Sequence, residues 1–298
     1  VYGSNLLASL PNPEQTRKAL QELEFLVSVD VLPAEICGWS DVVLPEATYL
    51  ERCDDVYAPP YREPFVAVRQ EVVPPQHDSK PGWWIAKQLA AKLGIPECLP
   101  FKDIEEYLRF RVEKSGIEWE TLKREGVIMG PPAPIYVEDG AALAFDTPSG
   151  KVEFWSEQLA KKGFDPVPKY TRHPAPPEGY MRLVTGRSPV HTFSRTQSNP
   201  LLTSLMQENE LWVNAATATR LGVKGGQYVR LKNQDGIESS RIRVKATQRI
   251  RPDTVYMVYG FGQRNAMAKF GGQRGASAAQ LNTRYATDPL MGGTSIHA

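Results

Sequence analysis

The chain of 298 residues lacks several features that mark whole classes of protein. Its formal net charge is only +1, so it has no basic excess of the kind that nucleic-acid binding requires. No apolar run approaches the roughly 18 residues that a membrane-spanning helix needs, and no internal repeat or low-complexity tract is present. With 41% hydrophobic and 23% charged residues, we expect a globular chain of one large or two ordinary domains.

Cysteine is also scarce. Cys37, Cys53 and Cys98 are far apart, and none belongs to a C-x-x-C pair. This spacing argues against a disulfide scaffold and against a zinc or iron–sulfur site built from these three residues alone. We therefore predict no metal-ligating residues in this chain, and the sequence does not identify catalytic residues.

The first part of the chain follows the order of a parallel α/β unit, which is strand, glycine loop, helix, strand. Residues 25–30 and 40–45 are the predicted strands, and a helix is predicted over residues 13–20 with Asn12 as its N-cap. The chain opens on Val1 rather than Met, in a pattern typical of the end of an earlier strand. We therefore expect the natural polypeptide to begin upstream.

Two candidate binding features fall at one edge of this unit. Ligands of open α/β sheets bind beyond the carboxyl ends of the strands, where Gly3-Ser4-Asn5 and Asp30 lie in this sequence. A carboxylate at a strand end can accept hydrogen bonds from a ribose or a guanine edge. Asp30 could equally cap a helix or interact with a helix dipole, and the residues alone leave these roles open.

The middle of the chain is less regular. Residues 47–81 are dense in proline, tyrosine and arginine, with a candidate strand over 65–70. Residues 131–177 are rich in proline and glycine, as long surface connections are, and a hairpin can form over 147–154. Between these segments, apolar periodicity predicts helices over residues 83–93, 103–113 and 119–125.

From Met181 onward the pattern changes to short strands and turns, which is typical of a small β-barrel. A brief helix is predicted over residues 215–221. The predicted strands cover residues 181–184, 212–214, 227–231, 240–246 and 254–258. Several glycines follow and are expected to form a flexible loop over the barrel: Gly260, Gly262, Gly271, Gly272 and Gly275.

A polar loop follows the strand predicted over residues 181–184. Its glycine allows a ligand to approach the backbone closely, and guanidinium groups match phosphate geometry. The loop could therefore hold a flat, anionic ligand rich in heteroatoms, although composition alone favours a solvated surface loop. The residues concerned are Thr185, Gly186, Arg187, His191, Thr192, Ser194 and Arg195.

Taken in order, these pieces resemble the C-terminal part of the molybdopterin oxidoreductases of the dimethyl-sulfoxide-reductase superfamily. The resemblance runs nearly from end to end. It consists of Gly3-Ser4-Asn5, Asp30 ahead of Asp41, Val42-Val43-Leu44-Pro45 with Glu51, Thr185-Gly186-Arg187 with His191, Asn199-Pro200, Trp212-Val213-Asn214 and Asp288-Pro289. Residues 44–52, 62–70, 80–87 and 283–289 are similar to those of the polysulfide/thiosulfate reductase branch.

The resemblance implies a fold of the α/β plus all-β class. Residues 1–130 would be part of a parallel, dinucleotide-binding-like α/β domain that binds molybdopterin guanine dinucleotide. Residues 131–178 would be an extended connection. Residues 179–298 would form a six-stranded, double-psi-type β-barrel that also binds the dinucleotide.

The resemblance also implies a bis(molybdopterin guanine dinucleotide) cofactor with molybdenum or tungsten. The cysteines for a [4Fe–4S] cluster and the side-chain ligand to the metal would lie upstream, and none of the three cysteines here stands at a matching position. The implied cofactor-binding residues are Gly3, Ser4, Asn5, Asp30, Asp41, Thr185, Gly186, Arg187, His191, Thr192, Ser194, Gln280 and Asn282. Asp41 could instead cap the following strand. Gln280, with Asn282 nearby, stands where many relatives have a pterin-contacting Asn.

The implied function is reductive cleavage of polysulfide or thiosulfate in anaerobic respiration, with electrons that come from a quinol. An iron–sulfur electron-transfer subunit and a membrane quinol-oxidising subunit would be the partners, and no nucleic acid is expected. The protein would be peripheral, in the periplasm or on the outer face of the cytoplasmic membrane. Two alternatives stay open. The same scaffold could reduce arsenate, tetrathionate or selenate, or the chain could be a non-catalytic nucleotide-binding or assembly module.

Overall fold

The structure of the chain is a computed structural model. It describes residues 1–132, 143, 145–167, 169–170, 172, 174–265, 267, 272 and 274–295. The chain divides into two compact units that do not follow chain order. The first unit contains Val1–Ala47, His77–Lys80 and Pro176–Ala298, and the second contains Thr48–Gln76 and Pro81–Ala175.

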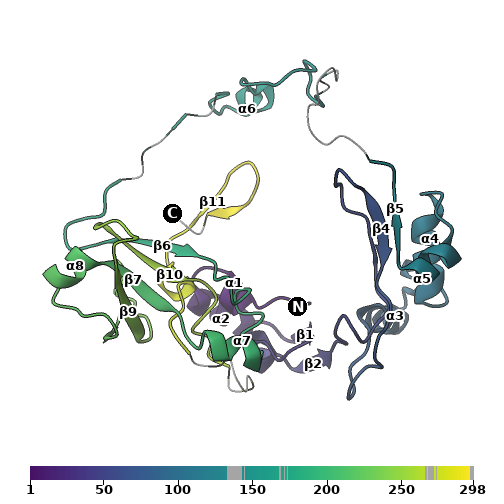
Figure 1. The fold of residues 1–298 in the computed structure, drawn as a ribbon, viewed down its shortest axis with the longest axis horizontal. Coiled ribbons are helices and arrows are strands. Elements are labelled where there is room, and N and C mark those ends of the chain that lie inside the picture. The colour runs from purple at the N-terminus through teal and green to yellow at the C-terminus, as the bar shows by residue number, and fades with distance from the viewer. Residues whose placement is uncertain are drawn as a thin grey trace. The chain divides into compact units, whose positions relative to one another are not determined.

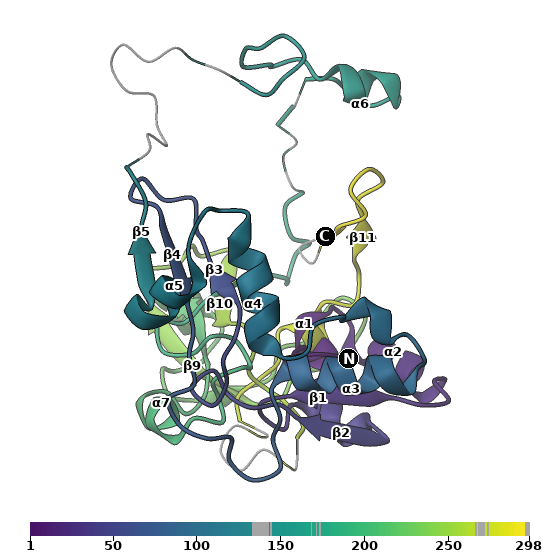
Figure 2. The ribbon, with the colours of Figure 1, turned by 90° about the vertical axis from the view of Figure 1, so that its right-hand side faces the viewer.

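The N-terminal part of the first unit is a small parallel sheet with helices on one side. β1 (Val27–Asp30) pairs in parallel with β2 (Val42–Pro45), and Tyr2 bridges to the other edge of β1 at Val29. Figure 2 shows α1 (Leu6–Ser9) and α2 (Pro13–Gln21) on one side of these strands. The strand order is that of the predicted parallel α/β unit. A short 3-10 helix, η1 (Glu35–Trp39), connects β1 to β2 and contributes to the local core.

The larger part of the first unit is a five-stranded mixed sheet in the order β6-β10-β7-β9-β8 (Figure 1). β6 pairs with β10, and β7 with β9, in parallel, whereas β10 with β7, and β8 with β9, are antiparallel. The strands are β6 (Arg182–Gly186), β7 (Glu210–Asn214), β8 (Tyr228–Val229), β9 (Ile242–Thr247) and β10 (Thr254–Val258), with helices α7 (Pro200–Leu205) and α8 (Ala215–Arg220) between them. A closed, six-stranded barrel is therefore not confirmed by the described residues.

The core of this sheet consists of inward-facing aliphatic side chains. In β9 the burial pattern alternates, and Ile242 and Val244 are the buried residues. Leu211 and Val213 of β7 and Met257 of β10 pack against them. Such a half-buried alternation is what the period-two pattern of the sequence predicts for strands with one face on a core.

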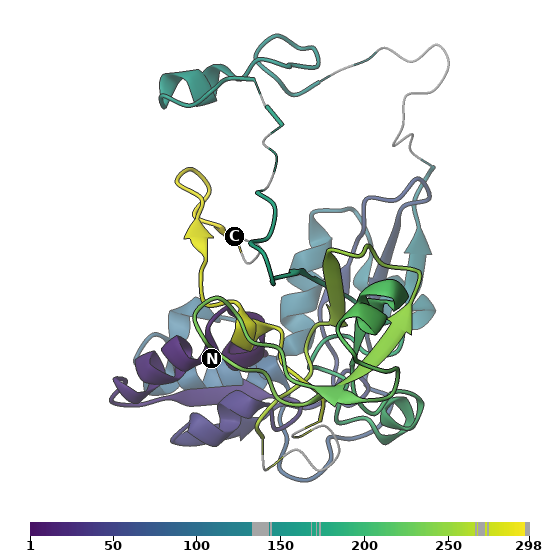
Figure 3. The ribbon, with the colours of Figure 1, turned by 90° about the vertical axis from the view of Figure 1, so that its left-hand side faces the viewer.

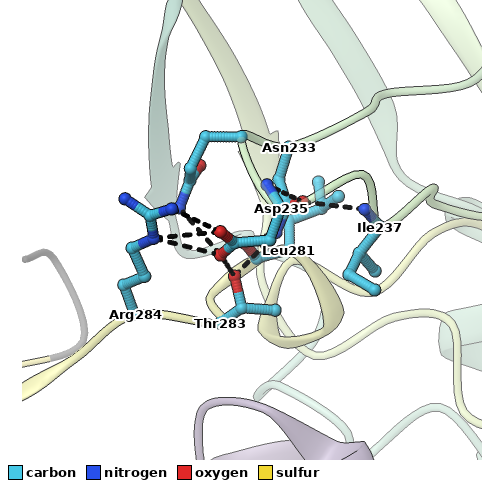
Figure 4. Close-up of polar contacts among 7 residues, drawn as sticks. Asn233, Asp235, Ile237, Leu281, Thr283 and Arg284 are labelled. Atoms are coloured by element: carbon cyan, nitrogen blue, oxygen red, sulfur yellow. Dashed lines mark hydrogen bonds and ion pairs between the residues drawn. The ribbon is translucent and has the colours of Figure 1, made fainter.

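The chain ends in η3 (Ala279–Leu281) and a two-stranded hairpin, β11 (Ala286–Thr287) with β12 (Thr294–Ser295). Figure 3 shows this hairpin projecting away from the five-stranded sheet. Its base is held by a cluster of polar contacts (Figure 4). Asp235 accepts hydrogen bonds from Thr283 and Arg284, and Asn233 Nδ2 donates to the Leu281 carbonyl at 2.9 Å and to Thr283 Oγ1 at 2.8 Å.

The second unit is a three-stranded antiparallel sheet covered on one face by helices. β4 (Phe65–Val68) lies between β3 (Val56–Tyr57) and β5 (Val127–Met129). Figure 1 shows α4 (Ile104–Glu113) and α5 (Trp119–Glu125) on the same side of β4 and β5. The core is Val68, Leu108, Val112, Trp119 and Leu122. The unit also contains α3 (Gly82–Lys92), η2 (Pro96–Cys98) and α6 (Glu157–Lys161).

Most of the local predictions are confirmed. Asn12 caps α2, because its side chain accepts a hydrogen bond from the Gln15 amide at 3.3 Å. The helices predicted over 83–93, 103–113 and 119–125 are α3, α4 and α5. The prediction of a hairpin over residues 147–154 is wrong, since the described chain forms a turn there without strand pairing.

The glycine segment after β10 also differs from the expected flexible loop. A Cβ at Gly260 would lie 2.5 Å from the Phe193 carbonyl carbon, and one at Gly262 would lie 2.3 Å from the Ser277 amide nitrogen. These glycines allow backbones to pack closely, whereas Gly271 lies outside the described residues. Across the described ranges, no helix has both the length and the apolar character needed to cross a membrane.

Candidate functional site

The loop that precedes α1 begins at a glycine in the left-handed region. Gly3 has a φ of +56°, and its amide donates to the Val29 carbonyl at 2.8 Å, which fixes the loop to β1. The Asn5 carbonyl then accepts from the Ala8 and Ser9 amides, so Asn5 begins α1. The Asn5 side chain does not cap the helix. Its Nδ2 instead donates to Gln263 Oε1 at 3.3 Å.

Asp30 lies at the carboxyl end of β1, as predicted, and is half-buried. Burial raises the pKa of its carboxyl group, and nearby Glu46 adds to that rise. The backbone amide of Leu32 donates to Asp30 Oδ1 at 3.3 Å and opposes the rise, as does the guanidinium of Arg195. Arg195 belongs to the loop after β6, so the two predicted loops approach each other at Asp30.

His191 lies inside the loop after β6 and is only 4% exposed. Its Nε2 faces the Met206 carbonyl at 2.9 Å and must donate to it, so Nδ1 accepts from the Thr196 hydroxyl at 3.3 Å. Both ring nitrogens are therefore occupied within the loop. The imidazole therefore holds the loop in shape through its two nitrogens.

Arg187 is an exposed basic side chain of the same loop, as is Arg195. Its guanidinium lies 5.2 Å from the centroid of the Phe193 ring and forms no ion pair within the described part of the chain. The Arg187 carbonyl accepts from the Tyr256 hydroxyl at 3.2 Å, which fixes the backbone beneath the side chain. A Cβ at Gly186 would lie 2.6 Å from the Tyr256 ring, so a larger residue here would displace that ring. Thr185 is half-buried, and Thr192 is exposed.

A third segment joins the two loops, and we call residues 260–265 the bridging segment. Gln197 Nε2 donates to the Gly260 carbonyl at 2.7 Å, which holds the bridging segment to the loop after β6. Gln263 Nε2 donates to the Ser194 carbonyl at 3.2 Å, while Gln263 Oε1 accepts from Asn5. On the same segment, Asn265 Nδ2 donates to the Pro33 carbonyl at 2.5 Å, just beyond β1.

The structure thus brings Asn5 and Ser194 together through one side chain, and Asp30 near Arg195. It does not bring Asp41 to them. Asp41 Oδ2 accepts from the Leu26 amide at 2.7 Å and precedes β2, at the amino edge of the parallel strands. Four residues of strand, about 13 Å, separate that edge from the edge where Asp30 lies.

Gln280 and Asn282 lie on η3 and directly after it. Gln280 Nε2 donates to the Glu238 carbonyl at 3.2 Å. Gln280 also lines a small surface pocket together with Gln263, Arg17 and Arg264. The side-chain amide of Asn282 makes no hydrogen bond to any residue that the structure describes, although Leu281 and Thr283 on either side of it are bonded to Asn233.

Sequence reasoning missed the bridging segment, although a signal was present. Gly260 and Gly262 alternate with other residues directly after β10, which is a pattern for close backbone approach rather than for flexibility. The two amide side chains that follow, Gln263 and Asn265, are 7% and 4% exposed. Buried amides of this kind need partners, which Gln263 finds in the two loops and Asn265 finds at the Pro33 carbonyl.

Comparisons with known proteins identify the family. The profile described as "Molydopterin dinucleotide binding domain" matches residues 181–298, and that described as "Molybdopterin oxidoreductase" matches residues 1–92. The chain belongs to the molybdopterin oxidoreductase family. The thiosulfate reductase molybdopterin-containing subunit PhsA of Salmonella typhimurium is 31% identical over 311 residues, which cover 94% of this chain and 39% of that protein.

Two further proteins that this chain resembles are named for another reaction, the hydration of acetylene. Acetylene hydratase of Syntrophotalea acetylenica is 32% identical over 168 residues, or 56% of this chain and 22% of that protein. The structure of acetylene hydratase from Pelobacter acetylenicus shares the fold, with a TM-score of 0.77, 23% identity and coverage of 96% of this chain and 40% of that chain. The chain therefore spans about two fifths of the relatives that it matches from end to end.

The residues of the site fit a nucleotide-tailed cofactor. Asn5 Oδ1 is buried and has no hydrogen-bond partner among the described residues, so it needs a donor from outside them. The Arg187 guanidinium, which forms no ion pair with a residue that the structure describes, suits a phosphate. By contrast, no group of three or more His, Cys, Asp or Glu side chains that could hold a metal ion occurs in the described part of the chain.

Proposed function

We propose that this chain is the C-terminal part of the catalytic subunit of a reductase with a bis(molybdopterin guanine dinucleotide) cofactor, which cleaves polysulfide or thiosulfate reductively in anaerobic respiration. The observation that carries the proposal is the 31% identity to a thiosulfate reductase subunit over 94% of the chain. In the same proposal, a [4Fe–4S] cluster, an iron–sulfur subunit and a membrane quinol-oxidising subunit deliver electrons on the outer face of the cytoplasmic membrane. Such a cofactor supplies two-electron redox chemistry at molybdenum or tungsten when bound.

The residues of this chain bind and orient that group. Ionised Asp30 accepts hydrogen bonds from guanine N–H groups, and Asn5 Oδ1 accepts one more. Arg187, with Thr192 beside it, pairs with phosphate oxygens from the side of the five-stranded sheet. His191 keeps that loop in shape through Met206 and Thr196 without meeting the ligand. Position and charge complementarity are therefore the contribution of this chain.

The test is made on the full natural polypeptide. We expect near-stoichiometric molybdenum or tungsten by elemental analysis, release of guanine nucleotide on acid hydrolysis, and oxidation of a reduced viologen dye by thiosulfate or polysulfide. Arg187→Ala should lower cofactor content about tenfold, because a charge-assisted phosphate contact is lost. The matched Arg249→Ala, at an exposed position, should leave the content unchanged. A polypeptide that contains neither metal nor nucleotide contradicts the proposal and supports an assembly module.

A second candidate is a different reaction on the same scaffold. The observation that favours it is the 32% identity to an acetylene hydratase over 56% of the chain. Assays with arsenate, tetrathionate, selenate and acetylene distinguish it from the first candidate. Turnover of one of these without turnover of thiosulfate or polysulfide would leave the cofactor assignment intact and replace the substrate.

A further inference from the structure

An unbroken series of amide groups joins the loop after β6 to the loop before α1. The Ser194 carbonyl oxygen can only accept a hydrogen bond, and Gln263 Nε2 donates to it at 3.2 Å. Gln263 Oε1 therefore faces the opposite way, where Asn5 Nδ2 donates to it at 3.3 Å. One backbone carbonyl thus determines the orientation of both side-chain amides.

This orientation leaves Asn5 Oδ1, the other end of the Asn5 side-chain amide, facing away from Gln263. This atom is buried and lacks a hydrogen-bond partner among the residues that the structure describes. Because a carbonyl oxygen can only accept hydrogen bonds, the group that binds to Asn5 Oδ1 must carry an N–H or an O–H. The diphosphate of a dinucleotide has no such hydrogen at neutral pH, whereas guanine has ring and amino N–H groups and ribose has hydroxyls.

We propose that Gln263 is a positioning residue that turns Asn5 Oδ1 toward the nucleoside part of the cofactor, so that Asn5 meets a guanine N–H or a ribose O–H and not the phosphates. The proposal rests on the proposed function, which supplies the nucleotide, and it specifies which part of the nucleotide Asn5 recognises. Gln263 is suited to this role because it is 7% exposed and follows Gly262, whose φ is +79° and whose Cα packs against Ser277.

Glutamate at position 263 offers a direct test of the hydrogen-bond direction. A protonated glutamate has the same polarity as glutamine, because its O–H can donate to the Ser194 carbonyl while its C=O accepts from Asn5. An ionised glutamate places a second acceptor against that carbonyl and breaks the series. Leucine at the same position keeps a similar volume and removes both hydrogen bonds.

The experiment measures the binding of two probes, GDP and pyrophosphate, to the full polypeptide prepared without cofactor, by isothermal titration calorimetry. We expect Asn5→Leu and Gln263→Leu to weaken GDP binding about tenfold and to leave pyrophosphate binding unchanged. Burial at position 263 should raise the pKa of the introduced carboxyl group above that of a free glutamate. Relative to wild type at the same pH, Gln263→Glu should therefore bind GDP normally at about pH 5 and about tenfold more weakly at about pH 8. Gln88→Leu, at an exposed position of α3, is the matched control and should change neither affinity.

Three results would overturn the proposal. The first is a parallel loss of GDP and pyrophosphate affinity in Asn5→Leu, which would place Asn5 at the phosphates. The second is an equal loss of affinity for both probes in the Gln263 variants at every pH, together with a loss of thermal stability. This result would show that Gln263 only holds the two loops together. The third is unchanged GDP affinity in Gln263→Leu. A wild-type polypeptide that binds neither probe would instead refute the proposed function itself, and this inference with it.

Discussion

Asp30 and Arg195 lie within electrostatic reach of one another, although one ends β1 and the other belongs to the loop after β6. Burial raises the pKa of the Asp30 carboxyl group above its ordinary value of 3.8, and the Arg195 guanidinium offsets part of that rise. A half-buried carboxyl group of this kind is costly to ionise in the free protein. A ligand that donates hydrogen bonds to it stabilises the ionised form and lowers its pKa again.

The first prediction concerns the pH dependence that follows from this relationship. Because the folded pKa is raised, the contribution of Asp30 to stability is greatest at low pH and decreases as the pH rises from 3.8 through the folded value. The affinity for the ligand has the opposite pH dependence, since only the ionised Asp30 carboxylate accepts hydrogen bonds from two N–H groups. We expect the affinity for GDP to fall as the pH is lowered through the pKa of Asp30.

Titration calorimetry across this pH range checks the prediction. Asp30→Asn should remove the pH-dependent step and weaken GDP binding about tenfold at neutral pH. Asp41→Asn is the matched control, because Asn can still accept from the Leu26 amide at the other edge of the strands. An unchanged pH profile in Asp30→Asn would contradict the assignment of Asp30 to the nucleotide site.

The second prediction separates the shape of the loop from its binding surface. His191→Leu leaves the Met206 carbonyl without its donor, so the free energy of unfolding should fall by about 1–3 kcal/mol. The folded fraction should still bind GDP within about twofold of wild type, because the ring does not meet the ligand. Urea denaturation and calorimetry measure the two quantities. A strong loss of GDP affinity with an unchanged free energy of unfolding would show that His191 contacts the nucleotide directly.

The third prediction concerns the close packing of the bridging segment. Gly260→Ala should destabilise the protein by about 3 kcal/mol, because the new Cβ meets the Phe193 backbone at a φ of +93°. Gly3→Ala, at a φ of +56° in open space, should cost only about 1 kcal/mol. Thermal unfolding of the two variants provides the comparison. Equal costs would show that the backbones are less closely packed than described.

The fourth prediction concerns the base of the C-terminal hairpin. Hydrogen bonds from Arg284 and then Thr283 lower the pKa of the Asp235 carboxyl group, so this anchor is present above its ordinary pKa and is lost as the pH falls through the lowered value. Arg284→Ala should speed amide hydrogen exchange over residues 283–290, whereas Arg249→Ala should not. Identical exchange in both variants would show that the ion pair does not hold the hairpin.

The sequence predicted local structure better than long-range contact. Period and capping signals identified α2 through Asn12, and the strand-end rule placed Asp30 and the Gly3 loop at one edge. The hydrogen-bond partners of His191 and Asp41 could not be predicted, because the Met206 carbonyl and the Leu26 amide lie outside the sequence patterns that contain these two residues. The bridging segment was missed for the same reason, since glycine spacing does not reveal which backbone it approaches.

The first compact unit unites residues 1–47 with residues 176–298, and the bridging segment that completes the site lies late in the chain. During synthesis on the ribosome, the loop around Asn5 emerges long before Gln263 exists to orient it. Closing so long a loop is entropically costly and slow. The proposed nucleotide site is therefore complete only once residues 260–265 have left the ribosome and Gln263 has met Asn5.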